Sequence, residues 1–266
     1  MIDIFEEITR VKREGAKAVL ATIVQGERGS PGKTGFRMLV YPDGRIMGTV
    51  GGGMLEEKVR EDALRCMLSR RAELVEYTLD ERTAHGLGML CGGKVKVFLE
   101  IIEENSRLFV FGGGHIALSL VQFAKQLDYV VVVADNREEF SNKQRFPLAD
   151  ETQTGDYAHI IRFLQFREGD SVVIVTHGHA HDEVVLKECL LKSPLPGYIG
   201  MIGSKGKIAA TFSHLKEQGI SPSSLARVRS PIGLDLGGTT PAEIALSIMA
   251  EIVADKYGKA AGLRQT

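Results

Sequence analysis

The sequence predicts an α/β protein in two domains, a smaller α+β domain followed by a domain built on a parallel sheet. The 266 residues exceed the length of one ordinary domain. Up to residue 104, strand-like runs outnumber helical patterns, as in an antiparallel α+β domain. From residue 105, continuous apolar runs alternate with helical patterns, which is typical of a parallel sheet buried on both faces. The polar run 103–106 separates the two patterns, so we expect domains at 1–104 and 105–266.

The composition excludes several classes of protein. Hydrophobic residues make up 44% of the chain, charged residues 25%, and the net charge is −1, so no basic excess indicates a nucleic-acid partner. There is no apolar run of about 18 residues and no secretory signal, so we expect no membrane association and a cytoplasmic location. Three cysteines do not make a disulfide framework and suit a reducing compartment.

The first domain combines helical and strand-like periods. Pro42, Asp43 and Gly44 supply the turn of a hairpin, and Gly51 interrupts the strand that follows it. The expected elements are a helix over residues 2–13, strands over 18–24, 36–41 and 45–50, a helix over 55–67, and strands over 73–79 and 94–102.

The second domain alternates strands and helices. Thr240 and Glu243 form a capping box at the start of the last helix, which ends before Gly258. The expected strands are 108–111, 129–134, 171–176 and 198–202, and the expected helices end near 127, cover 157–166 and 183–191, start at 204, and cover 241–257.

A glycine-rich turn follows the first strand of this series. Gly112, Gly113, Gly114 and Ala117 fit the pattern G-x-G-x-x-A between a strand and a helix. In that pattern the first glycine permits a tight turn and the second lets the backbone approach a diphosphate. The motif predicts a Rossmann-type domain.

Asp135 ends the next strand, where an acidic residue commonly binds a ribose hydroxyl. A dinucleotide such as NAD(P) is therefore one candidate ligand, although the domain could bind another nucleotide or serve as a scaffold. His115, at the start of the helix, either contacts the ligand or faces solvent.

Three alternating histidines, His177, His179 and His181, follow the strand 171–176 and precede Asp182. In an extended segment they would share one face and could hold a metal ion, but the string THGHAHD inverts the last two residues of the metallo-β-lactamase-type signature. We favour a loop that lines the ligand crevice at the end of a parallel strand. A third interpretation makes Asp182 a helix cap and the histidines solvated.

Two further segments could bind anions. Gly203, Ser204 and Lys205 open a helix, where amide groups, a hydroxyl and an ammonium group could converge on an anion; alternatively, Ser204 is an N-cap alone. The glycine-rich segment 233–240 also precedes a helix and is expected to face the same crevice.

Cysteines and glycines single out other candidates. Cys66 and Cys189 lie on apolar helix faces, where a buried thiol is the default. Cys91 is flanked by glycines and is the cysteine most suited to a reactive or ligating role. Gly52 and Gly53 leave room for a ligand and supply amide donors.

Taken together, these segments resemble the XdhC/CoxI family of xanthine dehydrogenase accessory proteins along nearly the whole chain. The resemblance rests on GSPGKTGFRMLVYPDGRIMGTVGGGMLEE, HGLGMLCGGKVKVFLE, FVFGGGHIA, VADNREEF, THGHAHD, YIGMIGSKGK and SPIGLDLGGTTPAEIALSIMAEI. The chain departs from the family pattern at Met54, where Cys or His is frequent, and at Gly32, where Arg is expected after Pro31.

The resemblance implies a chaperone rather than an enzyme, one that binds molybdenum cofactor (molybdopterin) and delivers it to a xanthine dehydrogenase-type molybdoenzyme. A cysteine desulfurase as a second partner and a homodimer are compatible with that role. The rival hypothesis is an NAD(P)-dependent oxidoreductase that uses the glycine turn and Asp135. No catalytic residue and no metal site are assigned. The candidate cofactor-binding residues are Gly52, Gly53, Cys91, Gly112, Gly113, Gly114, His115, Asp135, His177, His179, Ser204 and Lys205.

Overall fold

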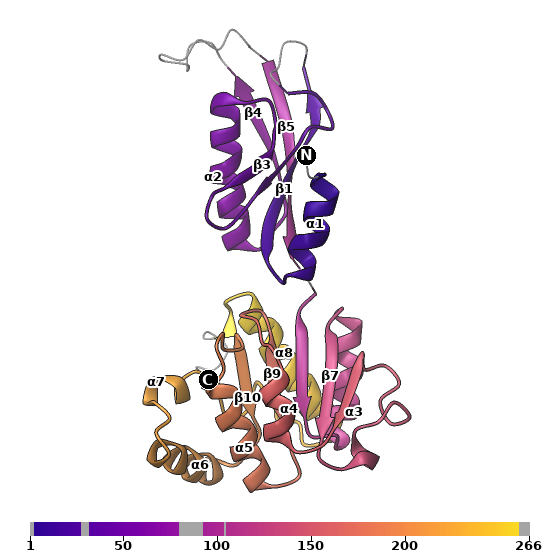
Figure 1. The fold of residues 1–266 in the computed structure, drawn as a ribbon, viewed down its shortest axis with the longest axis vertical. Helices are drawn as coiled ribbons and strands as arrows, with labels where there is room; N and C mark the ends of the chain where they lie inside the picture. The colour runs from indigo at the N-terminus through magenta and orange to yellow at the C-terminus, as the bar shows by residue number, and fades with distance from the viewer. Residues whose placement is uncertain (1–2, 28–31, 80–92, 104, 261–266) are drawn as a thin grey trace. The chain divides into compact units, whose positions relative to one another are not determined.

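The computed structural model describes residues 3–27, 32–79, 93–103 and 105–260. The chain divides into two compact units, Met1–Glu104 and Asn105–Thr266, called here the first and the second unit. The predicted fold class is confirmed, because the first unit contains an antiparallel sheet with helices and the second a parallel sheet with helices (Figure 1). Within the described ranges, every helix is too short or too polar to span a membrane.

The first unit has a five-stranded sheet in the order β3-β2-β1-β5-β4, with antiparallel pairing throughout. The predicted hairpin is confirmed as β2 and β3, with Leu39 opposite Met47. The elements are α1 (Ile4–Arg13), β1 (Lys17–Gly26), β2 (Arg37–Val40), β3 (Ile46–Gly48), α2 (Gly53–Ser69), β4 (Glu73–Leu79) and β5 (Gly93–Glu103).

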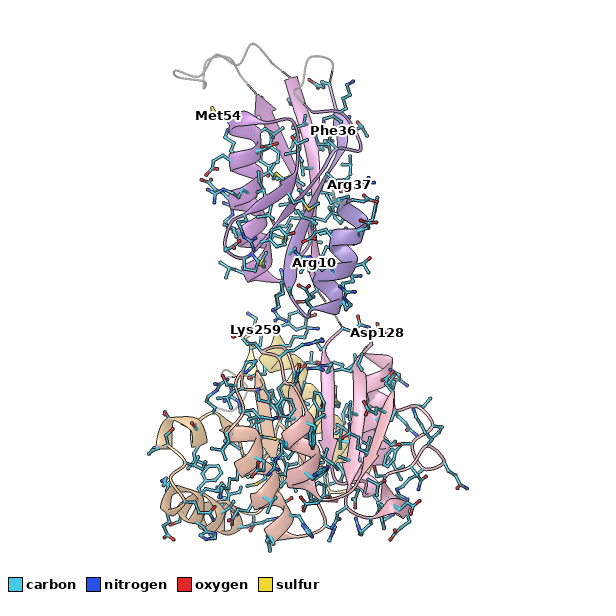
Figure 2. All side chains as sticks on the ribbon, in the orientation of Figure 1. Arg10, Phe36, Arg37, Met54, Asp128 and Lys259 are labelled. Carbon is cyan, nitrogen blue, oxygen red and sulfur yellow. The ribbon has the colours of Figure 1, made fainter. Side chains whose placement is uncertain are left out.

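The central strand β1 is buried on both faces, because successive side chains of a strand point to opposite sides. Ala18 and Leu20 belong to the apolar cluster that includes Val11 of α1. Val19 and Ile23 belong to the cluster formed with α2. Each helix therefore covers one face of the sheet. Figure 2 shows the side chains of this unit and labels Met54, which lies in the first turn of α2.

The second unit has a six-stranded sheet in the order β11-β10-β9-β6-β7-β8, and every pair is parallel. The chain builds β6, β7 and β8 outward in one direction and then returns to place β9 on the other side of β6. Its elements are β6 (Arg107–Phe111), α3 (His115–Gln126), β7 (Val130–Asp135), a 3-10 turn (Glu138–Phe140), β8 (Glu151–Thr154), α4 (Tyr157–Phe163), β9 (Ser171–Ile174), α5 (His179–Leu190), β10 (Tyr198–Met201), α6 (Lys205–Glu217), α7 (Pro222–Leu225), β11 (Val228–Arg229) and α8 (Pro241–Lys256).

Helices cover both faces of this sheet (Figure 1). On one face, α3 and α8 pack over alternate strand residues such as Val110 and Val133. On the other face, α4, α5 and α6 pack over the intervening residues such as Phe111 and Val132. Because both faces are covered, a ligand could reach the central strands of the sheet at their ends.

The structure differs from the sequence-based elements at several boundaries. The short strands β8 and β11 were not predicted, because ETQT and VR lack an apolar run. Helix α4 ends at Phe163, three residues short of the expected end at 166. Helix α5 begins at His179 rather than at residue 183, so the polar segment THGHAHD is already helical from its second histidine. The capping box of Thr240 and Glu243 is confirmed.

Candidate functional site at the carboxyl edge of the parallel sheet

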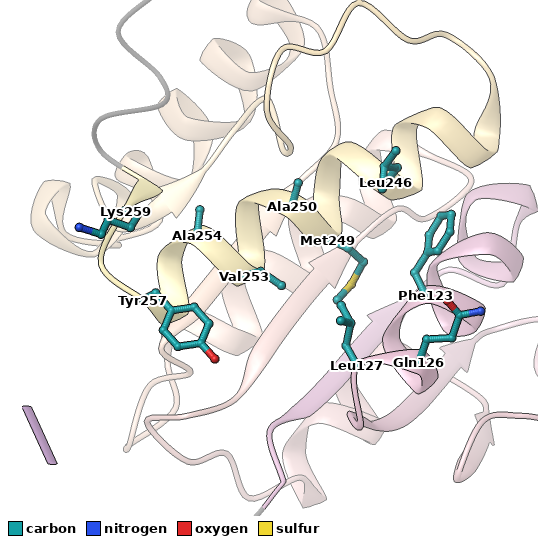
Figure 3. Close-up of a pocket in the computed structure, with 10 residues that line it drawn as sticks. All are labelled: Phe123, Gln126, Leu127, Leu246, Met249, Ala250, Val253, Ala254, Tyr257 and Lys259. Carbon is teal, nitrogen blue, oxygen red and sulfur yellow. The ribbon is translucent and has the colours of Figure 1, made fainter. Parts of the chain in front are cut away.

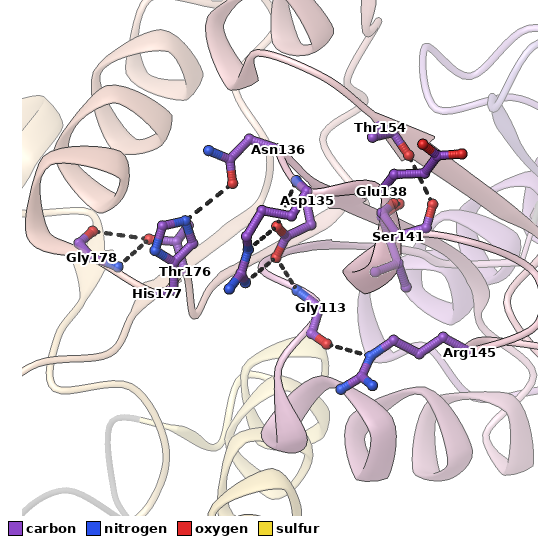
Figure 4. A network of polar contacts seen from close by, with 12 residues as sticks. Gly113, Asp135, Asn136, Glu138, Ser141, Arg145, Thr154, Thr176, His177 and Gly178 are labelled. Carbon is purple, nitrogen blue, oxygen red and sulfur yellow. Dashed lines mark hydrogen bonds and ion pairs between the residues drawn. The ribbon is translucent and has the colours of Figure 1, made fainter.

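The ends of β6, β7 and β9 meet at one edge of the second unit, because these three strands are parallel neighbours. We call this region the carboxyl edge and define it as residues 112–114, 135–137 and 176–178, which lie at the ends of those strands or within four residues after them. It lies where the strand order reverses, the position at which open α/β sheets bind ligands. Figure 4 shows the polar contacts that connect these three segments.

The glycine turn is required by close backbone packing. Gly112 has φ +111, and a Cβ atom there would collide with the carbonyl group of Val175 at the end of the neighbouring strand. A Cβ atom on Gly113 would collide with the carbonyl oxygen of Phe140. Gly114 has open space around it and is the N-cap of α3, with no side-chain hydrogen bond to the helix. The amide groups of the first turn of α3 are thus not capped by a side chain.

Asp135 is fully buried and is held by its neighbours. Its Oδ2 accepts from the Gly113 amide at 2.8 Å and from Arg137 Nη2 at 3.0 Å. Its Oδ1 accepts from the Arg137 amide at 3.0 Å and from Arg137 Nε at 2.9 Å. Burial by itself raises the pKa of Asp135, but the hydrogen bonds from Arg137 and Gly113 outweigh burial, so the pKa lies below its ordinary value. The carboxylate is therefore charged and engaged within the protein.

Two guanidinium groups lie against the Phe140 ring near the glycine turn. Arg137 Cζ is 3.7 Å from the centre of the Phe140 ring, and Arg145 Cζ is 4.8 Å from the same ring. Arg145 Nε also donates to the carbonyl oxygen of Gly113 at 2.8 Å (Figure 4). The glycine turn is thus flanked by positive charge, a feature that the glycine and acid pattern of the sequence did not reveal.

The histidine loop is only partly extended. His177 Nε2 lies 3.1 Å from Asn136 Oδ1, which joins the ends of β9 and β7. His179 is the first residue of α5 and His181 follows within the same helix, so the three imidazoles do not share one face of a strand. His177 and His181 do come together, with ring centres 4.6 Å apart.

Asp182 is buried in the interior behind this loop. It accepts from the amide and hydroxyl of Thr176 at 3.1 Å and 2.6 Å, and from Lys207 Nζ at 2.6 Å. Its carboxylate is therefore occupied by structural contacts. Among the described residues, no group of three or more His, Cys, Asp or Glu side chains could hold a metal ion.

A buried tyrosine lies next to the histidines. The Tyr157 ring is 5.6 Å from that of His181 and 6.2 Å from that of Phe111, measured between ring centres. Burial, followed by the charge of Asp135, raises the pKa of Tyr157. Its hydroxyl has no hydrogen-bond partner within the described part of the chain.

Ser204 and His179 share a pocket between the starts of α5 and α6. Ser204 is the N-cap of α6 and accepts from the Lys207 amide at 3.4 Å, so the capping interpretation holds for its side chain. Lys205 is exposed and does not line the pocket. The pocket has a volume of about 650 Å³ and is lined by His179, Ala180, Glu183, Ser204, Lys207, Ala210, Thr211 and His214.

The glycine-rich segment before α8 is anchored by a buried carboxylate. Glu251 accepts from the Gly233 amide at 2.8 Å and from the Tyr198 hydroxyl at 2.6 Å. These bonds connect α8, β10 and the start of the segment 233–240.

The candidates in the first unit are Gly52, Gly53 and Cys91. Gly52 is the N-cap of α2 with φ +88, and its amide donates to Glu56 Oε1 at 3.0 Å. Gly53 is the first residue of α2 and is exposed. Cys91 lies outside the described residues. At Gly32 a Cβ atom would collide with the Val50 carbonyl, which explains why this position holds glycine.

A different pocket lies between α3 and α8. It has a volume of about 630 Å³, and Leu127, Met249 and Tyr257 are among its lining residues (Figure 3). None of the residues predicted from the sequence to bind a cofactor lines it. The candidate residues predicted from the sequence and this apolar pocket therefore lie on different parts of the surface.

The strand order and the glycine turn at its reversal define a protein whose second unit is a Rossmann-type domain. Comparison with known families agrees: the XdhC Rossmann domain model matches residues 108–252, and the XdhC and CoxI family model matches residues 11–78. The chain belongs to the XdhC and CoxI family.

Individual relatives are distant. The uncharacterized protein YqeB of Escherichia coli K12 is 30% identical over 98% of this chain, and the chain spans only 48% of the length of YqeB. A probable xanthine dehydrogenase subunit of Bacillus subtilis 168 is 26% identical over 89% of this chain and 92% of its own length. The molybdenum cofactor insertion chaperone PaoD of E. coli K12 is 23% identical over 90% of this chain and 83% of its own.

A crystal structure of a xanthine dehydrogenase (BH1974) from Bacillus halodurans is similar in fold. Its TM-score is 0.54 at 24% identity, and the match covers 97% of both chains. At this identity the similarity supports the fold alone.

Proposed function

We propose that this chain binds the molybdenum cofactor and delivers it to a molybdenum hydroxylase of the xanthine dehydrogenase type. The observation that carries the proposal is the similarity to the cofactor insertion chaperone PaoD, which extends over 90% of this chain. The similarity to a probable subunit of xanthine dehydrogenase, over 89% of the chain, supports the same enzyme system.

In this role, the phosphate of the cofactor binds at the start of α3. Gly114 caps this helix without a side-chain hydrogen bond, and no acidic residue occupies the first turn. Free amide groups and the positive end of the helix dipole are therefore available to an anion. His115, at the first position of the helix, supplies a further donor.

Each unit contributes further candidates, which are considered separately. His177 lies at the same carboxyl edge, and His179 and Ser204 line the adjoining pocket between α5 and α6. Cys91 supplies a sulfur ligand that suits molybdenum. In the first unit, Gly53 is the candidate amide donor, because the Gly52 amide already donates to Glu56.

The test is the amount of pterin that the chain carries. The protein is purified from a host that makes the cofactor, the bound pterin is oxidised to its fluorescent form, and pterin per chain is measured. We expect near-stoichiometric pterin, and activation of an apo-hydroxylase by the loaded protein. A wild-type chain that carries no pterin and does not activate the hydroxylase would contradict the proposed function.

Matched variants at Gly114 test the placement of the phosphate. Gly114→Asp adds a carboxylate that caps the helix, so it preserves folding while competing with the phosphate. Gly114→Ala adds no charge, and nothing lies within 4 Å of the new Cβ atom. We expect the aspartate variant to lose most of its pterin and the alanine variant to keep it. Equal pterin loading of the two variants would contradict the placement of the phosphate at the start of α3 and would leave the proposed function itself standing.

Cys91 has its own test. Cys91→Ser removes the sulfur and keeps the size of the side chain. We expect this variant to lose molybdenum in elemental analysis of the loaded protein, with little change in thermal stability. Unchanged molybdenum content would remove Cys91 from the proposed site.

A further inference from the structure

The end of β7 offers positive charge where a nucleotide ribose would lie. An acidic residue at this position commonly accepts hydrogen bonds from the ribose hydroxyls. In this chain both oxygens of Asp135 already accept hydrogen bonds, two from the Arg137 side chain, one from the Arg137 amide and one from the Gly113 amide. A ribose diol would have to displace Arg137 from a fully buried carboxylate.

Arg137 retains donors after this pairing. Its Nε and Nη2 bind Asp135, and a guanidinium group has five N–H donors, so Nη1 is left for another acceptor. Its charge is balanced by Asp135, and its plane lies over the Phe140 ring. Arg137 therefore keeps a ribose hydroxyl from reaching the Asp135 carboxylate, and its Nη1 group remains able to donate hydrogen bonds to a ligand.

Arg145 adds an unbalanced charge at the same place. Its Nε donates to Gly113 O, while its two terminal nitrogens have no hydrogen-bond partner in the described ranges. No described carboxylate forms an ion pair with it. Two guanidinium groups consequently contact one aromatic ring beside the glycine turn, and planar guanidinium groups bind phosphate through paired N–H donors.

The segment that carries these arginines is held in place. Ser141 Oγ donates to the Gln153 carbonyl at 2.7 Å. Thr154 Oγ1 donates to the Ser141 carbonyl at 2.9 Å (Figure 4). The Arg145 amide donates to Asn142 Oδ1 at 2.8 Å. The arrangement is anchored to β8 and does not depend on the arginine side chains alone.

We propose that Arg137 and Arg145 form a phosphate subsite at the end of β7, which receives a phosphate carried on the ribose of a nucleotide and disfavours a nucleotide with a free ribose diol. The inference goes beyond cofactor delivery, since it concerns nucleotide recognition and requires no molybdenum. It names the chemical class of ligand at this edge as a ribose-phosphorylated nucleotide.

The experiment compares NADP⁺ with NAD⁺, which differ only in a phosphate on the adenosine ribose. Affinities are measured by isothermal titration calorimetry on the full chain, purified without pterin. We expect NADP⁺ to bind at least about tenfold more tightly than NAD⁺, because charge-assisted hydrogen bonds to phosphate are strong. Equal affinities, or no binding of either below about 1 mM, would overturn the proposal.

Variants assign the preference to these side chains. Arg145→Gln should abolish the preference for NADP⁺, and Arg162→Gln, an exposed arginine in α4, should leave it unchanged. Arg137→Gln frees Asp135 and should shift the preference toward NAD⁺. A preference that survives Arg145→Gln would overturn the subsite, and thermal melting of each variant shows whether it is folded.

These outcomes are separable from those for cofactor delivery. Pterin loading without any nucleotide preference would leave the chaperone function in place and remove the phosphate subsite. A preference for NADP⁺ in a chain that never carries pterin would support the phosphate subsite and contradict the chaperone function.

Discussion

Lys207 in α6 donates a hydrogen bond of 2.6 Å to the buried carboxylate of Asp182 in α5. The same carboxylate accepts from the hydroxyl of Thr176, two residues after the end of β9, at 2.6 Å. The Asp182 carboxylate therefore connects α5 to α6 and to the loop that carries His177.

Lys207→Met is expected to destabilise the protein by about 3–5 kcal/mol, because it leaves a buried carboxylate without its cation. Urea unfolding measures the effect. Lys216→Met, at an exposed position on the same helix, is the control and should cost less than about 0.5 kcal/mol. Similar unfolding curves for the two variants would mean that the ion pair is not stabilising.

Gly113→Ala is expected to destabilise the second unit by about 1–3 kcal/mol, because the added methyl group collides with the backbone oxygen of Phe140. Gly114→Ala, one residue later and in open space, is the matched control. Thermal melting compares the two. If Gly113→Ala melts like the control, the close approach of Phe140 to the glycine turn is wrong.

Glu7 is expected to make stability depend on pH in the acid range. Hydrogen bonds from Arg10 and then Tyr41 lower the pKa of the buried Glu7 carboxyl from 4.5 to about 2. A lowered folded-state pKa means that this stabilisation is fully present above pH 4.5 and is lost as the pH falls toward 2.

Glu7→Gln removes this effect. We expect Glu7→Gln to lower the free energy of unfolding by about 1–3 kcal/mol at neutral pH. This difference from wild type should become smaller as the pH falls toward 2. Denaturant unfolding across this pH range measures the difference. Glu14→Gln, half-exposed at the C-cap of the same helix, is the control. A constant difference between Glu7→Gln and wild type at every pH would contradict the prediction.

Cys66 and Cys189 are expected to resist alkylation in the folded protein. Both are fully buried, and burial raises the pKa of each thiol, so little reactive thiolate is present. Peptide mass spectrometry after iodoacetamide treatment should show labelling more than about tenfold slower than in urea. Equal rates in both conditions would show that these sites are open to reagent.

Much of the fold was predictable because apolar periodicity reports burial directly. The strands β6, β7, β9 and β10 of the parallel sheet are largely continuous apolar runs, and their alternation with helices is enough to predict the fold class. The hairpin turn and the capping box of the last helix were predictable from residue types with known local preferences. The short strand Glu151–Thr154 was missed because it is polar and owes its conformation to pairing with β7.

The candidate site was less predictable, because contacts rather than spacing decide what each side chain does. Asp135 was expected to be available to a ribose, and its role in ligand binding stays a prediction. The sequence placed Arg137 two residues away without indicating that it folds back on the carboxylate. In an extended segment the three histidines would share one face, but α5 begins at His179, and the structure instead brings His177 and His181 together.

The sequence by itself determined the class of each domain, the glycine turn at the end of β6 and the family, since these depend on local pattern and residue type. Only the tertiary structure decided that Phe140 lies against Gly113 and that Arg137 and Arg145 share its ring. The physical reason is that charge and close packing act between groups far apart in the chain, and the path of the backbone brings those groups together.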